Sequence, residues 1–253
     1  MTGLQGLVLH QMAMSGNCYK VRLAAHQLGI ALSLKDYPLH GGETRQPEFL
    51  AKNANGRVPL LEYANGRVLA ESGAIIFHLS EGTKLQPGDS WARAQMLQWM
   101  FFEQYSHEPY VAVARYWLSY AAKEALEKKR HLLAEWHAKG HAALAVMEDH
   151  LKKQDWFAGT AYSIADIALY GYTHCAGEGG FELGLSGAAT LAGARCRAAG
   201  SYCALGVGGC CIGEDELNSS NRMRADPASD RKIHLSRRHS PAGMAGQSPA
   251  MTI

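Results

Sequence analysis

The stretch from residue 55 to residue 72 reads NGRVPLLEYANGRVLAES. Within it, an apolar pair stands on either side of Asn65-Gly66. This arrangement is typical of a tight β-hairpin, because Asn and Gly both tolerate a positive φ. From Ser72 to Leu79 the apolar residues recur at helical spacing, as on the buried face of a helix. The stretch therefore predicts two short antiparallel strands that lead directly into a helix.

The residues before the hairpin predict a strand, a helix and a second strand. Leu7-Val8-Leu9 is a short apolar strand, and residues 32–37 alternate as a strand does. Between them, apolar residues at helical spacing run from Val21 to Leu28, and Gly29 stands where a C-cap glycine belongs. The order strand, helix, strand, hairpin, helix resembles a thioredoxin-like domain, which we place at residues 1–81.

The pattern after the hairpin is helical throughout, following a linker with Gly and Pro over residues 81–89. A long helix is expected to bend near Pro109, since proline removes a backbone hydrogen bond. A second long amphipathic helix is predicted over residues 123–151. Ser163 and Asp166 have the spacing of a capping box at the start of a further apolar helix. A second, all-helical domain therefore follows the first.

Composition limits the classes of protein that fit. Of the 253 residues, 47% are hydrophobic and 19% charged, which allows a sizeable core and argues against global disorder. The net charge of +2 gives no electrostatic reason to expect nucleic acid or a membrane surface as a partner. We identify no signal peptide and no apolar run near the roughly 20 residues that span a bilayer. Cys18 and Cys175 are isolated and form no disulfide framework, so we expect a cytoplasmic protein.

Three motifs together resemble the cytosolic glutathione transferases, in particular the bacterial serine-type enzymes of the theta, zeta and nu kinds. They are Asn55-Gly-Arg-Val-Pro59, Glu71-Ser72 at a helix start, and Ser15-Gly-Asn-Cys-Tyr-Lys-Val-Arg22 after the first strand. The resemblance covers residues 4–184. It implies a thioredoxin-like glutathione-binding domain and a glutathione-transferase-type helical domain over residues 90–184. It also implies a homodimer, glutathione as a cosubstrate, no metal, and detoxification of an electrophilic small molecule.

In that family the first domain holds the tripeptide. If the Val58-Pro59 bond is cis, as the resemblance implies, the Val58 backbone turns outward and can pair with the cysteinyl backbone of glutathione. A helix start suits a carboxylate, and the resemblance assigns the γ-glutamyl carboxylate to Ser72 and the ammonium to Glu71. Simpler alternatives are a trans proline at a strand start and an N-cap role for Ser72. The glutathione-binding candidates are Arg57, Val58, Pro59, Glu71 and Ser72, with Arg45 and Gln46 in an earlier loop.

The sulfur centre must ionise a thiol whose pKa is about 8.5, because the thiolate is the nucleophile. A hydroxyl donor and unpaired amides at a helix start favour the thiolate. Ser15 matches the catalytic serine of the theta- and zeta-like classes and is our first catalytic candidate. Asn17, which matches an asparagine of nu-type enzymes, is second, and Cys18, near the catalytic cysteine of beta-class enzymes, is third. The alternatives are a helix cap for Ser15 and a small buried apolar residue for Cys18.

The second substrate is expected to lie against the helical domain. Tyr105, Tyr110 and Arg115 fall on the bent helix, where the pocket for that substrate would be, and an interface or core role is the alternative for each. His137 and His141 have the i, i+4 spacing of metal ligands on a helix. No third ligand accompanies them in the pattern, so a solvated helix surface is preferred and no metal is predicted.

Two other functions are compatible with these motifs. A redox enzyme would reduce glutathione mixed disulfides or peroxides, through Cys18 or directly through bound thiols. A non-catalytic glutathione-transferase-like binding protein would keep the fold without turnover. The joint presence of Ser15, Pro59, Glu71 and Ser72 argues against a pure binder.

The composition of the chain changes at Leu185. All five Trp and all six Phe lie before it, and the residues after it are rich in Gly, Ala, Ser and Arg. A disordered extension is one interpretation of residues 185–253. We favour a frameshift near codon 185, because permissible codons for Leu185 to Ala204, read one nucleotide later, encode a peptide that resembles the family's last helix. The genomic DNA tests this hypothesis, which fails if the actual codons do not allow that peptide.

Overall fold

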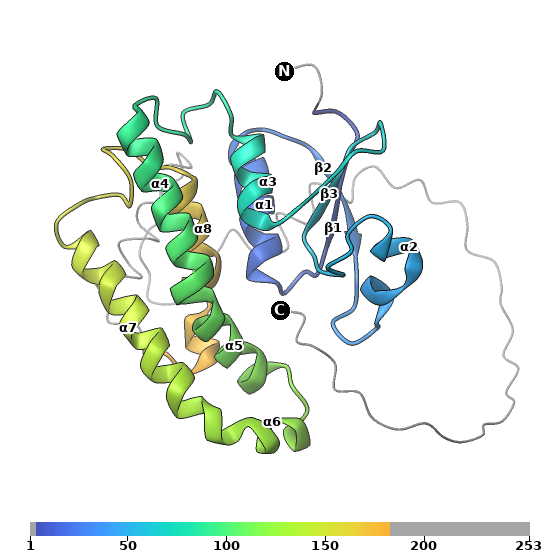
Figure 1. Ribbon diagram of the computed structural model, residues 1–253, viewed down its shortest axis with the longest axis vertical. Coiled ribbons are helices and arrows are strands. Elements are labelled where there is room, and N and C mark those ends of the chain that lie inside the picture. Colours follow the sequence, from blue (N-terminus) through green and yellow to red (C-terminus); the bar gives the residue numbers. More distant parts are fainter. Residues whose placement is uncertain (1–3, 183–253) are drawn as a thin grey trace, which may run out of the picture. The chain divides into compact units, whose positions relative to one another are not determined.

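The computed structural model describes residues 4–182 (Figure 1). Up to Leu79 these residues form a four-stranded sheet with helices, and from Ser90 onward they form helices alone. The elements are, in order, β1 (Leu7–Gln11), α1 (Gly16–Gln27), β2 (Leu32–Asp36), η1 (Glu43–Arg45), α2 (Pro47–Leu50), β3 (Leu60–Glu62), β4 (Val68–Ala70), α3 (Ser72–Leu79), α4 (Ser90–Phe102), η2 (Glu103–His107), α5 (Glu108–Ser119), α6 (Lys123–Lys129), η3 (Arg130–Leu132), α7 (Leu133–Leu151), α8 (Ile164–Thr173) and η4 (Ala176–Gly179). Of the η elements, η2 is a π-helix and the others are 3-10 helices.

The strands form one mixed sheet in the order β2-β1-β3-β4. β1 pairs in parallel with β2, with Leu7 opposite Leu32, whereas the other two pairs are antiparallel. A parallel pair needs a crossover connection, and α1 supplies it. Figure 1 shows α1 and α3 between the sheet and the helices that follow, with α2 beyond the sheet. The predicted thioredoxin-like domain followed by a helical domain is therefore confirmed.

The hairpin between β3 and β4 forms where the sequence predicts it, but its turn differs from the expected one. Only Gly66 has a positive φ, of 83°, and Asn65 does not. The side-chain oxygen of Asn65 instead accepts a hydrogen bond from the Arg67 N–H at 3.1 Å. The turn is thus made by an Asx-type contact and one left-handed glycine.

The long helix that begins at Ser90 bends as predicted, through a π-helix rather than at the proline itself. α4 ends at Phe102, the π-helix η2 follows, and Pro109 lies in the first turn of α5. Proline is tolerated in a first turn, because a backbone N–H at that position has no partner within the same helix and proline lacks one. The bend therefore falls at residues 103–107. Short π-helices of this kind occur frequently at functional sites.

The predicted helix over residues 123–151 is divided into three segments. The 3-10 helix η3 separates α6 from α7. None of the α6 residues is buried, so tertiary packing does not hold this short helix in line with α7.

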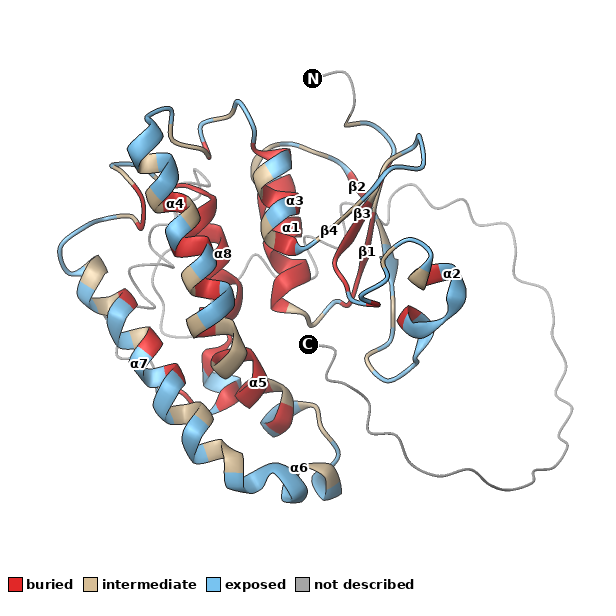
Figure 2. Ribbon diagram, viewed as in Figure 1, coloured by how far each residue is buried: buried red, intermediate tan, exposed pale blue. Residues whose placement is uncertain are grey.

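α8 begins with the predicted capping box, which is confirmed. The Ser163 N–H donates to Asp166 Oδ2 at 2.8 Å, and Ser163 Oγ accepts from the Ala165 N–H at 3.3 Å. All residues from Ile164 to Thr173 are buried, and Figure 2 shows α8 as one of the most completely buried helices. The centre of the helical domain is therefore α8.

α1 approaches α8 closely because two glycines lie at the contact. A Cβ at Gly16 would lie 2.5 Å from the Gly171 carbonyl oxygen and 2.7 Å from the Tyr172 ring. A Cβ at Gly171 would lie 2.6 Å from the Lys20 side chain. Only glycine allows such an approach, so the start of α1 lies directly against the helical domain.

The predicted altered tail, residues 185–253, lies outside the described residues. Among the helices of residues 4–182, none has the length and apolar character needed to cross a bilayer.

Candidate active site

Ser15 stands between β1 and α1 and caps the helix. Its Oγ accepts a hydrogen bond from the Cys18 N–H at 3.3 Å, and its own N–H donates to the Met12 carbonyl at 3.1 Å. The residue is partly exposed. The first amides of a helix have no partner within it and carry the positive end of the helix dipole. The start of α1 therefore offers a hydroxyl and N–H groups to an anion.

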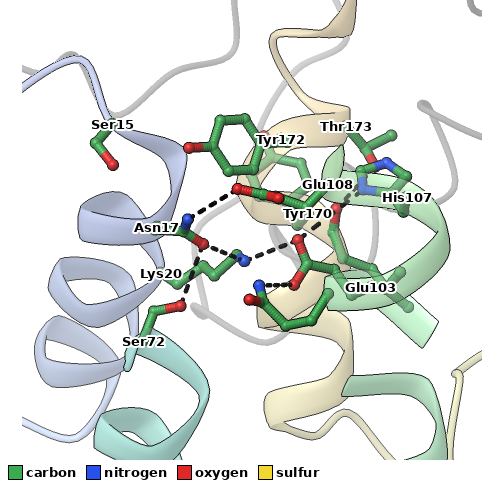
Figure 3. Close-up of polar contacts among 12 residues, drawn as sticks. Ser15, Asn17, Lys20, Ser72, Glu103, His107, Glu108, Tyr170, Tyr172 and Thr173 are labelled. Carbon is green, nitrogen blue, oxygen red and sulfur yellow. Dashed lines mark hydrogen bonds and ion pairs between the residues drawn. The ribbon is translucent and has the colours of Figure 1, made fainter. Parts of the chain in front are cut away.

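Asn17 connects the starts of α1 and α3 with the helical domain (Figure 3). Its Oδ1 accepts hydrogen bonds from Ser72 Oγ at 3.2 Å and from Lys20 Nζ at 2.7 Å. Its Nδ2 donates to Glu108 Oε1 at 3.2 Å. Two donors at the oxygen and a carboxylate at the nitrogen define the orientation of the amide. The second N–H of the amide remains for a further acceptor.

Lys20 and Glu103 form an ion pair inside the protein. Nζ and Oε1 are 2.8 Å apart, and each side chain is 1% exposed. Gln104 Nε2 donates to the other carboxylate oxygen of Glu103 at 2.8 Å. Buried charges need such partners, because their removal from water is costly. The pair links α1 of the thioredoxin-like domain to η2 of the helical domain.

His107 ends the π-helix as a neutral ring. Its Nε2 lies 3.0 Å from Thr173 Oγ1, and its Nδ1 lies 4.0 Å from Glu103 Oε1. Burial, with a smaller effect of the Lys20 charge, lowers the pKa of His107 to about 3. The Glu103 charge is already matched by Lys20 and does not keep the imidazole protonated. His107 thus belongs to the core.

Glu108 begins α5 and faces Asn17 (Figure 3). Burial raises the pKa of its carboxyl group, and the charge of Glu103 raises it further. Lys20, the hydrogen bond from Asn17 and the charge of Arg57 act in the opposite direction. The influence of Arg57 indicates that the loop before β3 and the start of α5 face the same site.

Cys18 lies one turn into α1 and is completely buried. Its Sγ accepts a hydrogen bond from the Met12 N–H at 3.4 Å. Burial raises the pKa of the Cys18 thiol, and the hydrogen bonds from Met12 and Ser15 only partly oppose this effect. This environment disfavours a thiolate on Cys18 and suits the alternative of a small buried residue.

The Val58-Pro59 peptide bond is cis, as the family resemblance implies. Val58 packs in one apolar cluster with Met12, Cys18 and Leu60, which brings it beside the start of α1. Neither its N–H nor its C=O forms a backbone hydrogen bond with another residue of the described range. An unpaired donor and acceptor on one residue can receive an extended peptide.

α3 begins at the Glu71-Ser72 pair. Glu71 has φ 68° and ψ 117°, a positive φ that no other non-glycine residue in the described range adopts. Such a conformation costs about 1–3 kcal/mol and is typical of ligand-binding sites. Glu71 is exposed, whereas Ser72 is buried with its hydroxyl on Asn17. Ser72 is the first residue of α3, and Glu71 holds the N-cap position that was the alternative for Ser72.

Three further glutathione candidates are exposed and lie between β2 and β3. Arg45 Nη1 donates to the Asn55 carbonyl at 2.9 Å, a contact that stabilises the loop itself. Gln46 precedes Pro47 at the N-cap of α2, without a side-chain capping bond. Of the three, Arg57 is the one whose charge influences Glu108 across the site.

Arg115 supports the loop that carries Ser15. Its Nη1 donates to the Met14 carbonyl at 2.7 Å, its Nη2 to the Tyr120 hydroxyl at 2.7 Å, and its Nε to Glu178 Oε2 at 2.8 Å. These contacts tie the residue before Ser15 to α5 and η4. Arg115 therefore has a clear structural role beside its predicted place at the second substrate.

The three residues predicted for the second substrate have different surroundings. Arg115 is buried, as described above. Tyr105 lies on η2 and is 85% exposed. Tyr110 lies on α5, where Lys139 Nζ is 5.2 Å from the centre of its ring. Their contacts do not bring the three side chains together around one space.

Several polar residues of the site were missed by sequence reasoning. They are Lys20, Glu103, Glu108, Tyr172 and Thr173 (Figure 3). For Glu103 and Glu108, the signal in the sequence was that acidic residues stand at the bend of an otherwise apolar helix. Helical spacing alone does not distinguish a buried acid from a solvated one, because the partner comes from α1.

Family models match the chain in two parts. The model "Glutathione S-transferase, N-terminal domain" matches residues 9–86, and "Glutathione S-transferase, C-terminal domain" matches residues 130–174. Glutathione S-transferase D7 of Anopheles gambiae is 31% identical over 166 residues, which are 64% of this chain and 72% of that protein. The chain belongs to the glutathione S-transferase family. The predicted family is thereby confirmed.

Two further relatives match different shares of the chain. A solved structure described as a possible glutathione S-transferase from Rhodopseudomonas palustris is 46% identical, with a TM-score of 0.70 over 76% of this chain and 85% of that one. Protein URE2 of Eremothecium gossypii is 34% identical over 137 residues, 49% of this chain. The match spans only 39% of that URE2 protein.

The two histidines on α7 contact the residues that follow α8. His137 Nε2 lies 2.8 Å from the Gly179 carbonyl oxygen, and both His137 and His141 contact the Phe181 ring. In residues 4–182, no group of three or more His, Cys, Asp or Glu side chains is arranged to hold a metal ion.

Proposed function

We propose that the protein is a glutathione transferase, which ionises the glutathione thiol and presents it to an electrophilic small molecule. The observation that carries this proposal is the hydrogen bond of 3.2 Å between Ser72 and Asn17, which joins the starts of α3 and α1. Each helix start suits an anion. Glutathione carries a thiolate and a γ-glutamyl carboxylate on adjacent residues, and family membership supports the same ligand.

In the proposed complex, the Val58 N–H and C=O pair with the cysteinyl backbone of glutathione beside the cis Pro59. Ser72 and the first amides of α3 take the γ-glutamyl carboxylate, and the exposed Glu71 carboxylate takes the ammonium. Opposite charges and a helix dipole support this orientation. The residues proposed for the glycyl end are Arg57, Arg45 and Gln46.

The proposed chemistry is attack by the glutathione sulfur. The Ser15 hydroxyl, the second N–H of Asn17 and the first amides of α1 stabilise the thiolate, and the thiol proton passes to solvent. The sulfur electron pair forms the new bond to the electrophilic atom, and in a substitution the leaving group departs with its bonding pair. Tyr105 and Tyr110 are proposed to face the electrophile, and Arg115 to hold the Ser15 loop.

Calorimetric titration with glutathione tests the binding step. We expect a saturable heat with a Kd of about 1 mM or lower. Cysteinylglycine lacks the γ-glutamyl group and is expected to bind about tenfold more weakly, since it does not reach Ser72 and Glu71. A Ser72→Ala variant should weaken the binding of glutathione and leave that of cysteinylglycine nearly unchanged. No heat at millimolar glutathione would contradict the proposal.

Turnover assays separate the proposed function from its two rivals. A transferase conjugates an aryl halide and keeps this activity in a Cys18→Ala variant that folds. A redox enzyme that works through Cys18 reduces a glutathione mixed disulfide and loses that activity in the same variant. Glutathione binding without turnover in either assay would identify a binding protein.

We also propose that the protein is a homodimer that associates through an apolar groove on α3, β4 and α4. The groove has a volume of about 640 Å³, and its apolar lining includes Val68, Leu69, Phe77, Leu97, Met100 and Phe101. Phe101 is 70% exposed and lies at the rim. Each copy thus presents an aromatic side chain and an apolar groove on one face, which suits a two-fold interface.

Phe101→Ala is expected to weaken dimerisation by about 100-fold. Each copy would lose about 1.5 kcal/mol of apolar burial, and the two-fold axis doubles the loss. Sedimentation equilibrium at several protein concentrations measures the effect. Val146→Ala, which truncates another exposed apolar residue on α7, is the matched control and should leave the association unchanged. A wild-type protein that is monomeric at millimolar concentration would contradict the dimer.

We further propose that the enzyme acts in the cytoplasm, in detoxification. The free thiol of Cys18 in the described part of the chain is compatible with a reducing compartment. A deletion strain with unchanged tolerance of electrophiles, or fractionation that finds the protein elsewhere, would argue against this role.

A further inference from the structure

Tyr172 brings a hydroxyl from α8 to the start of α1. The residue is 1% exposed, and its ring lies against the backbone of Gly16, where an added Cβ would be 2.7 Å from the ring carbons. Figure 3 shows its hydroxyl directed toward Ser15. The close contact that Gly16 allows thus places a second hydroxyl beside the candidate catalytic one.

The Tyr172 hydroxyl is buried without a hydrogen-bond partner among the described residues. Buried polar groups are nearly always paired, and an unpaired one lowers stability. A phenylalanine would fill the same space without this penalty. The hydroxyl does not stabilise the free protein. It is therefore expected to have a functional role.

Two polar groups of the sulfur site lie next to this hydroxyl. Burial raises the pKa of Tyr172 well above its usual value, and the nearby Ser15 side chain and Asn17 backbone N–H only partly oppose this effect. Tyr172 therefore stays protonated and remains a hydrogen-bond donor at every pH at which the enzyme would work.

The oxygen of Ser15 has room for one more donor. A hydroxyl group has two acceptor positions and one hydrogen. One acceptor position of Ser15 Oγ is taken by the Cys18 N–H at 3.3 Å. If Tyr172 donates to the other position, the Ser15 hydrogen must point away from both donors. It is then available to an acceptor such as a bound sulfur, and each hydrogen bond strengthens the next.

We propose that Tyr172 is a positioning residue for the sulfur site: its hydroxyl donates to Ser15 and thereby directs the Ser15 hydrogen to the glutathione thiolate. This inference rests on the proposed glutathione transferase function. The helical domain would then contribute directly to ionisation of a thiol that the first domain holds.

Other ionisable groups also face this site, and the test must keep them constant. They are Cys18 and Lys20 on α1, Glu103 and His107 on η2, Glu108 on α5 and Arg57 before β3. Replacement of Tyr172 by phenylalanine removes one oxygen and changes none of these residues.

Tyr172→Phe is expected to raise the pKa of the bound thiol by about 0.5 to 1 and to lower kcat/KM by about 3- to 10-fold at neutral pH. The thiolate absorbance of bound glutathione as a function of pH measures the first effect. The melting temperature should stay the same or rise, because an unpaired hydroxyl is removed. A purely structural role for Tyr172 predicts a change in stability and none in the thiol pKa.

Tyr63→Phe is the matched control. The Tyr63 hydroxyl is also buried without a partner in the described range, but it lies in the hairpin between β3 and β4. The control variant is expected to match Tyr172→Phe in stability and the wild type in thiol pKa. A rise of the thiol pKa in both variants would overturn the specific role of Tyr172.

Two further measurements complete the test. In a Ser15→Ala background, Tyr172→Phe should have no additional effect on the thiol pKa, because Tyr172 acts through Ser15. A fluorotyrosine at position 172 is a stronger donor of the same shape and should lower the thiol pKa, which keeps the inference testable if the phenylalanine variant does not fold.

Normal glutathione binding with an unchanged thiol pKa in Tyr172→Phe overturns this inference alone. No glutathione binding by the wild type overturns it together with the proposed function.

Discussion

Ser15→Ala is expected to lower turnover with glutathione and an aryl halide by about 10²- to 10³-fold, the cost of removing one preorganised donor from a developing anion. The hydroxyl is partly exposed at the start of α1, with Asn17 and the first helix amides beside it. These groups remain in the variant, so binding of glutathione should be nearly unchanged. The pKa of the bound thiol should rise, and the pH–rate profile should move to higher pH.

The capping role of Ser15 requires a control, because its Oγ also accepts the Cys18 N–H. Loss of an N-cap to alanine costs about 1 kcal/mol, whereas glycine costs only a few tenths. Ser15→Gly should therefore lose as much activity as Ser15→Ala, but it should keep a higher melting temperature. Ser15→Thr keeps the hydroxyl and should retain most of the activity. If turnover followed the melting temperature across the three variants, or if the pH–rate profile did not move, Ser15 would be a helix cap only.

Much of the fold was predictable because its signals are local. Asn65-Gly66 locates a turn, Gly29 ends α1 with φ 68°, and the Ser163 capping box begins α8. Each of these signals depends on a few neighbouring residues. The break between α6 and α7 was not predicted, because it results from the absence of buried residues in α6 and not from a residue that ends a helix.

The candidate site was predictable only in its first domain. Ser15, Val58 and Ser72 stand at element ends, where the sequence pattern indicates them. The groups that orient these residues come from the helical domain and are distant in sequence, as in the contact between Asn17 and Glu108. A helical pattern describes one helix at a time, so it does not indicate that the acids at the bend of α4 and α5 lie against α1.

The largest expected effect on stability concerns the buried pair between α1 and η2. Lys20→Met should destabilise the protein by about 3–5 kcal/mol, because it leaves the Glu103 carboxylate buried without its counter-ion. Urea unfolding at constant pH measures the loss. Lys152→Met, which removes a lysine from exposed ion pairs at the end of α7, is the control and should leave the free energy of unfolding nearly unchanged.

The double variant Lys20→Met/Glu103→Leu separates the stability of the pair from its function. Removal of both charges leaves no carboxylate buried without a counter-ion. Apolar replacements of buried ion pairs are often neutral or stabilising. The double variant should therefore regain most of the free energy of unfolding that Lys20→Met loses. Activity should not return with it, because Lys20 Nζ also donates to Asn17 Oδ1 at 2.7 Å and helps to define its orientation. We expect a well-folded double variant with turnover reduced by about tenfold, since a misplaced group at a reacting centre is costly.

Full activity in the double variant would show that Ser72 and Glu108 hold Asn17 without the lysine. Stability that stays as low as in Lys20→Met would contradict the account of a charge left buried without a partner.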